Sequence, residues 1–332
     1  MSNAYKRSGV DLAAGDEVVK RIGDAVRASY TPQVLKGLGA FGGLYSAAEI
    51  TNLNDPVLVA STDSIGTKTK LAYLNNYATA GYDIVNHCVN DILVQGAKPL
   101  FFLDYFASAA IAPEVASRIV VSVAEACKAL GIPLLGGETA ELPGVYQDEE
   151  FDLVGTVVGV VERAKVVTGE RIQNGDKVFA LASGGLQTNG FSLARAVLGD
   201  ALDEPFGEHT VGLELLTPHR DYLEPVHALL NSVDVRGMAH ITGGGIPGNL
   251  VRVLPEGLGA KLEDSSWDVP KIFDLIETRG EISREEMNRV FNRGAGFLIV
   301  VAQEDAHKAA ANCPETLFEI GEIDTSGAIT LT

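Results

Sequence analysis

A carboxylate, a glycine, hydroxyls and a lysine lie close together in residues 61–68, directly after the short apolar run 57–60. Such a run is typical of a buried strand. At its end Asp63 could hold Mg²⁺, Gly66 would let backbone amides approach a phosphate, and Lys68 could supply positive charge to a phosphoryl group. The G-x-x-x-x-G-K-[ST] pattern of a P-loop is absent. On this segment alone, a strand-to-helix turn without a ligand remains the alternative.

The helical pattern over residues 81–95 carries a second set of polar side chains. Asp91 lies among apolar neighbours, where a carboxylate is unfavourable unless it is paired or bound to a metal, so a ligand role is favoured for it. Asn90 lies beside it. Asp83 is expected on a solvated helix face, and His87 is expected to be a core or surface histidine instead of a ligand.

A third polar segment, residues 136–141, follows the apolar strand predicted at 132–135. Two glycines there place Glu138 and Glu141 just past the predicted strand end, where ligands of α/β sheets collect. Both carboxylates are therefore candidates to complete a Mg²⁺ shell with Asp63 and Asp91. Mg²⁺ typically uses few protein carboxylates and keeps waters and phosphate oxygens.

The second half of the chain has two glycine loops, at 183–190 and 242–245, each between a predicted strand and a predicted helix. Backbone amides at such a helix start favour an anion, so the two loops together predict a phosphorylated substrate. Tight turns without a ligand are the alternative for either loop alone. His240 precedes the second loop and is a candidate acid/base or hydrogen-bond donor to the substrate.

Strand and helix patterns alternate through both halves, which predicts an α/β (α+β) fold with two domains, 1–168 and 169–332. The polar stretch 162–176 is the predicted connection. The pattern predicts the following elements: helices at 17–28, 81–95, 113–130, from about 190, at 270–279 and at 283–291, and strands at 57–60, 100–106, 132–135, 151–162, 177–182, 238–241 and 297–302.

Composition excludes several classes of function. The 332 residues have a net charge of 26 − 44 = −18, which disfavours nucleic acid and anionic membranes as partners. No apolar run is long enough to span a bilayer, the N-terminus lacks the apolar core of a signal peptide, and three scattered cysteines fit a reducing compartment. A cytoplasmic protein is expected.

Six motifs in one order resemble the phosphoribosylformylglycinamidine cyclo-ligase (aminoimidazole ribonucleotide synthetase) family, and the similarity runs from Tyr5 to Gly296. The motifs are Asp63-Ser-Ile-Gly-Thr-Lys68, Cys88-Val-Asn-Asp-Ile-Leu-Val-Gln-Gly-Ala97, Phe101-Phe-Leu-Asp-Tyr105, Gly136-Gly-Glu-Thr-Ala-Glu141, Asn189-Gly-Phe-Ser-Leu193 and His240-Ile-Thr-Gly-Gly-Gly245. Each motif alone is weak, but the six together are specific.

The resemblance implies a homodimer in which N-terminal strands of two subunits form a β-barrel, and a C-terminal α/β domain with a mixed sheet flanked by helices. It implies ATP and Mg²⁺ as cofactors and formylglycinamidine ribonucleotide as substrate. The implied reaction is phosphorylation of the formyl oxygen followed by ring closure to 5-aminoimidazole ribonucleotide, with release of ADP and phosphate, in purine biosynthesis. The glycine-rich stretch 37–43 resembles the mobile segment of the family near the nucleotide.

Matched motif by motif, the resemblance assigns ATP binding to Asp63, Gly66, Thr67, Lys68, Asn90, Asp91, Gly136, Gly137, Glu138 and Thr139. It assigns the metal to Asp63, Asp91 and Glu138. It assigns the substrate to Ser183, Gly185, Gln187, Asn189, Gly190, His240, Thr242, Gly243, Gly244 and Gly245. The predicted catalytic residues are Lys68, Asp91 and His240.

Two positions depart from the pattern of the family. Ser64 stands where the family usually has glycine, and Gln187 stands where it commonly has histidine. Glutamine can donate a hydrogen bond but cannot shuttle a proton near neutral pH, so Gln187 is predicted to bind and not to transfer protons. The alternatives are another ATP-using member of the superfamily, such as thiamine monophosphate kinase or a hydrogenase-maturation dehydratase, and a catalytically silent dimeric nucleotide-binding protein.

Overall fold

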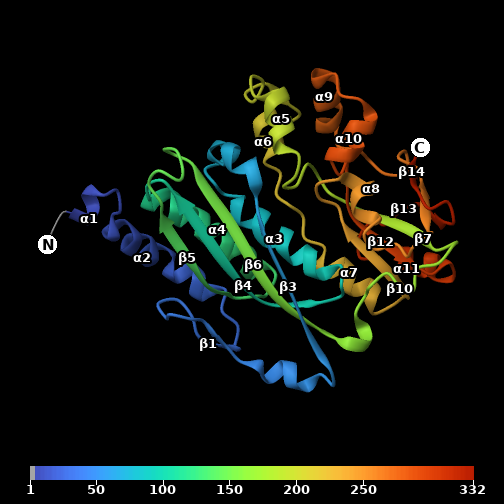
Figure 1. The fold of residues 1–332 in the computed structure, drawn as a ribbon, viewed down its shortest axis with the longest axis horizontal. Coiled ribbons are helices and arrows are strands. Elements are labelled where there is room, and N and C mark those ends of the chain that lie inside the picture. The colour runs from blue at the N-terminus through green and yellow to red at the C-terminus, as the bar shows by residue number, and fades with distance from the viewer. Residues whose placement is uncertain (1–3) are drawn as a thin grey trace. The chain divides into compact units, whose positions relative to one another are not determined.

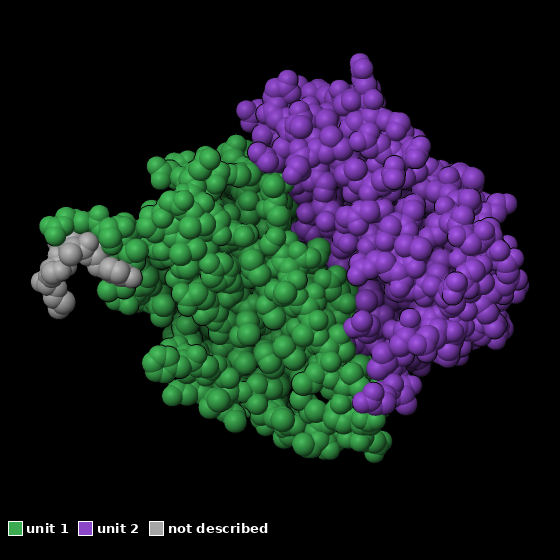
Figure 2. Space-filling model, viewed as in Figure 1, with its two compact units in different colours: residues 1–92, 98–162 green, residues 93–97, 163–332 purple. Residues whose placement is uncertain are grey.

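The computed structural model describes residues 4–332, which form two compact units. Unit 1 comprises the described residues through Ile92 together with Lys98–Glu162, and unit 2 comprises Leu93–Ala97 and Arg163–Thr332 (Figure 2). The longer segment of unit 2 starts at Arg163, a little before the predicted domain boundary at 168/169. Within residues 4–332 no helix combines the length and the apolar character needed to cross a bilayer.

Unit 1 is built on a four-stranded sheet in the order β3-β6-β4-β5 (Figure 1). Neighbouring strands are antiparallel except for the parallel pair β4/β5. The elements of unit 1 are α1 (Ala4–Arg7), α2 (Leu12–Ala28), β1 (Val34–Lys36), β2 (Leu44–Tyr45), η1 (Ala47–Asn52), β3 (Pro56–Ser64), η2 (Gly66–Asn75), α3 (Ala80–Leu93), β4 (Lys98–Ser108), α4 (Pro113–Ala129), β5 (Leu134–Glu141) and β6 (Phe151–Glu162).

Helices cover one face of this sheet. A side chain at Gly155 of β6 would collide with Ile84 of α3, so the helix lies directly against the strand there. Helix α4 begins with Pro113 in its first turn, as its sequence predicts, and packs so closely on α3 that a side chain at Gly81 would meet the backbone of α4. Helix α2 packs against α4 in turn.

The opposite face of the sheet, which we call the open face, is only half buried. Along β6, Leu153 and Val157 are buried on the helix side, whereas the alternate residues Val154 and Val158 are half exposed. Leu58 of β3, which pairs with Val160 of β6 on this face, is 62% exposed. This apolar face therefore has little cover within the chain.

Two predicted loops are strands instead. β3 continues through Asp63 to Ser64, and β5 continues from Leu134 to Glu141, so the segments 61–64 and 136–141 do not follow strand ends as predicted. The reason is pairing: residues Leu103 to Ser108 of β4 hold residues 136–141 in register, although glycine and glutamate disfavour strands.

Unit 2 is built on a six-stranded mixed sheet in the order β10-β12-β7-β13-β11-β14, in which only β11/β14 is parallel. Its elements are η3 (Arg163–Lys165), β7 (Lys177–Ala182), α5 (Phe191–Leu198), β8 (Pro205–Phe206), β9 (His209–Thr210), α6 (Val211–Leu215), α7 (Leu223–Leu230), β10 (Val235–His240), α8 (Gly245–Leu250), β11 (Gly259–Leu262), α9 (Lys271–Gly280), α10 (Arg284–Val290), β12 (Ala295–Val301), η4 (Gln303–Asp305), α11 (Ala306–Asn312), β13 (Phe318–Asp324) and β14 (Ile329–Leu331).

Both faces of this second sheet are buried. Val178 of β7 lies in a core with Leu250 of α8, and the next residue, Phe179, lies in a separate core with Val226 of α7. Alternate side chains of one strand therefore serve two cores. The predicted mixed sheet flanked by helices is confirmed.

Candidate active site

Two predicted metal ligands of unit 1 meet beside a histidine. Asp63 of β3 and Asp91 of α3 each place a carboxylate oxygen, and His87 a ring nitrogen, within 4.8 Å of one another. His87 Nε2 lies 2.9 Å from Asp63 Oδ2 and 3.8 Å from Asp91 Oδ2. Ser61 donates a hydrogen bond of 2.9 Å to Asp91 Oδ2. Strand β3 and helix α3 thus bring together residues that are far apart in the sequence.

This cluster favours ionised carboxylates. The hydrogen bond from His87 is the main cause that lowers the pKa of Asp63 below its usual range. Burial opposes a charged His87, but the hydrogen bond with Asp63 and the charges of Asp91, Asp63 and Asp83 outweigh it and raise the pKa of His87. The Asp63 side chain is 47% exposed and that of Asp91 27%, so both remain accessible to a cation.

The donor set fits Mg²⁺. Two accessible carboxylates are what this ion usually takes from a protein, since water and phosphate oxygens fill the remaining positions. His87 suits the role of an outer partner that orients Asp63, as histidine and carboxylate often support each other around metals. The structure thus gives His87 a contact that the sequence did not predict.

Glu138 does not join this cluster within one chain. In register, Glu138 pairs with Tyr105, which pairs with Val154 on the open face, whereas Asp63 pairs with Gly155 on the helix side. β3 and β5 are also the two opposite edges of the sheet. The assignment of Glu138 to the metal therefore stays a prediction.

Lys68 forms a buried ion pair. Its Nζ donates to Asp83 Oδ1 at 2.7 Å, and both side chains are 1% exposed. Burial is the largest influence on Lys68 and lowers its pKa. The expectation of a solvated Asp83 is wrong, because this ammonium gives the carboxylate a buried partner. Because Lys68 is buried, a phosphate could reach its ammonium only if neighbouring residues moved.

The remaining residues predicted to bind ATP lie on both sides of the sheet. Gly66 has a φ of 54°, in the left-handed region that glycine adopts without strain, and Thr67 beside it is exposed. Asn90 is buried on α3. Gly137 leaves room for Asp104, whose Oδ1 would lie 1.9 Å from a Cβ at that position. Gly136 and Thr139 are half buried on β5.

In unit 2 the loop 183–190 is held by Asn292. Ser183 Oγ donates to Asn292 Oδ1 at 2.9 Å, and Asn292 Nδ2 donates to the Gly185 carbonyl at 3.0 Å. Asn292 Oδ1 also accepts from the Gly294 amide at 2.8 Å. One buried amide therefore fixes the first part of the loop, and Ser183 serves this network instead of facing solvent.

Gln187 is buried and anchored to Tyr222. Its Nε2 donates to Tyr222 Oη at 2.7 Å, and Tyr222 in turn donates to the Ala182 carbonyl at 3.1 Å. Gln187 has a φ of 63°, an unusual backbone conformation for a residue other than glycine. The side chain thus joins the loop to the segment before α7.

The second loop, residues 242–245, needs glycine for its backbone conformation. Gly244 and Gly245 have φ values of 99° and 59°, and Cβ atoms at Gly245 and Gly190 would collide with neighbouring atoms. Asn249 of α8 donates to the Gly245 carbonyl at 2.8 Å, and Thr242 Oγ1 donates to Asn249 Oδ1 at 3.3 Å. The loop is therefore internally braced.

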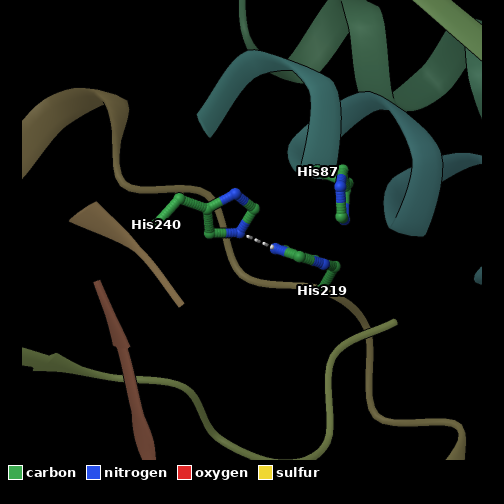
Figure 3. A group of neighbouring side chains, drawn as sticks. All are labelled: His87, His219 and His240. Atoms are coloured by element: carbon green, nitrogen blue, oxygen red, sulfur yellow. Dashed lines mark hydrogen bonds between the residues drawn. The ribbon is translucent and has the colours of Figure 1, made fainter. Parts of the chain in front are cut away.

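His240, at the end of β10, meets a second histidine. Its Nε2 lies 2.9 Å from Nε2 of His219. Figure 3 shows the two rings joined by this hydrogen bond. His219 Nδ1 lies 3.1 Å from Thr188 Oγ1 of the loop 183–190. His219 is 1% exposed and His240 5%. The predicted residue His240 thus belongs to a buried polar chain.

Comparison with known proteins matches both units to one family. Residues 46–161 match AIR synthase related protein, N-terminal domain, and residues 173–332 match AIR synthase related protein, C-terminal domain. A protein of Anaeromyxobacter sp. (strain K) named phosphoribosylformylglycinamidine cyclo-ligase is 46% identical, covering 98% of this chain and 97% of its own. The chain belongs to the phosphoribosylformylglycinamidine cyclo-ligase family. The resemblance drawn from the six motifs is confirmed, and so is the prediction of a ligase.

A second cyclo-ligase of the family, from Bacillus thuringiensis (strain Al Hakam), is 46% identical over 92% of this chain and 90% of its own. Solved structures share the fold at lower identity. Thiamine-monophosphate kinase from Stenotrophomonas maltophilia K279a has a TM-score of 0.68 at 17% identity, covering 94% of this chain and 95% of its own. The hydrogenase maturation protein HypE in complex with ATP also has a TM-score of 0.68, at 16% identity, covering 94% and 90%.

Four residues of this cyclo-ligase family member contact predicted site residues, although the sequence did not predict a role for them. They are His87, Asp83, His219 and Asn292. Asn292 lies in the stretch Phe291-Asn-Arg-Gly-Ala-Gly296, where the resemblance gave a usable signal. His219 lies in a short polar segment between α6 and α7 with no motif of its own, so no pattern in the sequence indicated it.

Proposed function

We propose that the chain catalyses the ATP-dependent cyclisation of formylglycinamidine ribonucleotide to 5-aminoimidazole ribonucleotide, with release of ADP and phosphate, in de novo purine biosynthesis. The observation that carries the proposal is the 46% identity to a named cyclo-ligase across 98% of the chain. The paired carboxylates of unit 1 and the two braced glycine loops of unit 2 support it, because they suit Mg²⁺ with a nucleotide and a phosphorylated substrate.

The chemistry requires two steps. An amide oxygen is a poor leaving group, so the formyl oxygen first attacks the γ-phosphate of ATP and ADP leaves. A nitrogen on the amidine side of the substrate then attacks the activated carbon, and phosphate departs with that oxygen. We propose Asp63 and Asp91 for Mg²⁺, which would offset charge on the phosphates, and the loops with His240 for the ribonucleotide. Holding the nitrogen against the carbon would lower the entropic part of the barrier.

The test is ADP release by the purified protein with Mg²⁺ and ATP, with and without formylglycinamidine ribonucleotide. We expect ADP only with that substrate, together with 5-aminoimidazole ribonucleotide. ATP binding without turnover would contradict the proposal and favour either a silent nucleotide-binding protein or another ATP-using member of the superfamily.

We also propose a cytoplasmic location, which suits the three free thiols of Cys88, Cys127 and Cys313.

His87 is expected to tune the affinity for Mg²⁺. His87→Leu removes the hydrogen bond that orients Asp63, and loss of such an outer partner typically weakens metal affinity about 10–100-fold. The measurement is the Mg²⁺ concentration for half-maximal activity, together with the rise in melting temperature on adding Mg²⁺ without ATP. His307→Leu on the surface of α11 is the control. An unchanged Mg²⁺ dependence in His87→Leu would contradict the expectation.

We propose that the open face of unit 1 is the interface of a homodimer. Apolar side chains of three strands are half exposed there, and exposed apolar patches mark interaction surfaces. In a symmetric dimer the same patch of each subunit contacts that of the other, which suits a face built from one sheet.

Val158→Glu, in the centre of that face, is expected to yield a monomer by light scattering, whereas Val19→Glu on exposed α2 is not. A dimeric Val158→Glu variant would exclude this interface.

A further inference from the structure

The side chain of Asn292 is buried behind the glycine loop 183–190, with 4% of its surface exposed. Its Oδ1 accepts from the backbone amide of Gly294 at 2.8 Å. Its Nδ2 donates to the backbone carbonyls of Gly185 at 3.0 Å and Leu186 at 3.3 Å. Because these partners are backbone groups of fixed kind, they define which end of the side chain is oxygen.

These bonds orient two consecutive peptide units of the loop. Every peptide bond in residues 4–332 is trans, so each carbonyl and the N–H that follows it point in opposite directions. The carbonyls of Gly185 and Leu186 point toward Asn292. The N–H groups of Leu186 and Gln187 therefore point away from it, and successive amides on one side of a loop make a concave site for an anion.

The amide of Leu186 is a buried donor that the protein itself does not satisfy. Leu186 is 2% exposed, and its N–H makes no hydrogen bond to any residue within 4–332. Buried backbone donors are nearly always paired, so a single unsatisfied one requires an explanation. An acceptor that binds from outside the chain, on the side of the loop opposite the asparagine, provides it.

The second glycine loop, 242–245, lies beside the first and is held in the same way. A Cβ at Gly243 would lie 3.5 Å from Asn189 Oδ1 of the first loop. Asn249 Nδ2 donates to the carbonyls of Gly243 at 3.3 Å and Gly245 at 2.8 Å. A buried asparagine therefore orients the carbonyls of each of these neighbouring loops.

We propose that Asn292 is a positioning residue for the phosphate of the ribonucleotide: by holding the carbonyls of Gly185 and Leu186, it presents the Leu186 amide to that phosphate. The inference rests on the proposed function for the identity of the substrate, whereas the oriented amide suits any phosphate monoester. It gives the stretch 291–296 a function that resemblance to the family alone did not assign.

The first test is a titration of the full-length wild type, labelled with nitrogen-15 at leucine, with ribose 5-phosphate. The amide resonance of Leu186 is assigned by its absence from the spectrum of Leu186→Met. We expect ribose 5-phosphate to shift this resonance in a saturable manner and ribose to leave it in place. An unshifted Leu186 resonance would overturn the proposal, and so would an equal shift with ribose.

The second test is Asn292→Asp, which keeps the shape of the side chain but replaces its donor with a carboxylate oxygen. We expect the affinity for ribose 5-phosphate to fall about 10–100-fold, as for a lost hydrogen bond to a charged group. KM for formylglycinamidine ribonucleotide should rise by the same factor, while kcat and KM for ATP stay unchanged. Asn292→Leu should act likewise without a new charge, and Asn312→Asp at the exposed end of α11 is the matched control.

Equal affinity of Asn292→Asp and Asn312→Asp for ribose 5-phosphate would overturn the proposal. A rise in KM for ATP as large as that for the ribonucleotide would do the same, because it would indicate general disruption of the fold. If the variants at Asn292 fail to fold, the titration of the wild type still decides. A shifted Leu186 resonance without turnover would refute the proposed function alone, whereas turnover without that shift would refute only this inference.

Discussion

Asp83→Ala is expected to lower the free energy of unfolding by about 3–5 kcal/mol, because it leaves the ammonium of Lys68 buried without this carboxylate. Lys68 and Asp83 are each 1% exposed, so water cannot replace the lost partner without opening the core. For a protein of this size the melting temperature should fall by about 4–7 °C.

A second variant separates structure from chemistry. Lys68→Met combined with Asp83→Leu removes both charges and should regain most of the stability, since apolar pairs often replace buried ion pairs without loss. If Lys68 contacts the phosphates during catalysis, this double variant stays inactive while stable. Wild-type ADP release by the stable double variant would refute a catalytic role of Lys68.

The matched control is a surface pair. Arg27 and Asp24 of α2 are 60% and 102% exposed, so Asp24→Ala should cost about 1 kcal/mol or less. Differential scanning calorimetry on the three variants measures the contrast. A loss of stability in Asp83→Ala no larger than that in Asp24→Ala would show that the buried pair contributes nothing beyond a surface bridge.

The second large effect concerns Asp104 of β4, whose pKa is raised by burial from 3.8 to about 7. The folded protein therefore keeps the proton of this carboxyl at a pH at which the unfolded chain has lost it. Stability from Asp104 is full below about pH 4, falls as the pH rises toward about 7, and levels off above that. At 1.36 kcal/mol per pKa unit the loss is about 4 kcal/mol.

Asp104→Asn removes the ionisable group and keeps a similar shape. We expect this variant to exceed the wild type by about 2–4 kcal/mol at pH 8 and to match it near pH 4. Urea denaturation at several pH values measures the difference. Asp16→Asn, at an exposed position of α2, should show no such trend. A difference that does not change with pH would exclude a raised pKa of Asp104 as the cause.

The strands predicted with correct limits are those whose conformation depends on their own residues. β6 and β7 have the predicted limits, 151–162 and 177–182, because their apolar runs end there at polar turns. β5 was predicted too short because residues 136–141 include two glycines and two glutamates, and only pairing with β4 makes them a strand. Partners in a sheet are not visible in a local pattern.

The candidate site also divides into residues that a local sequence pattern indicates and contacts that depend on packing. Asp91 was found because a carboxylate among apolar residues signals an unusual environment, and Asp63 because it comes directly after an apolar run that predicts a strand. The contacts of His87 with Asp63 and of His219 with His240 join residues 24 and 21 positions apart, through β3 with α3 and through a loop with β10. Such contacts depend on how elements pack, which residue type and spacing do not reveal.

The order of strands in unit 1 has a consequence for how the chain is made on the ribosome. β6 lies between β3 and β4 in the sheet but is the last of the four strands to be synthesised. Until residue 162 has emerged, β3 has no neighbour to bond with, and one edge of β4 stays bare. Bare edges invite pairing with other nascent chains. The period just before β6 appears is therefore when this protein most needs a chaperone, and slow codons placed there would prolong the exposure.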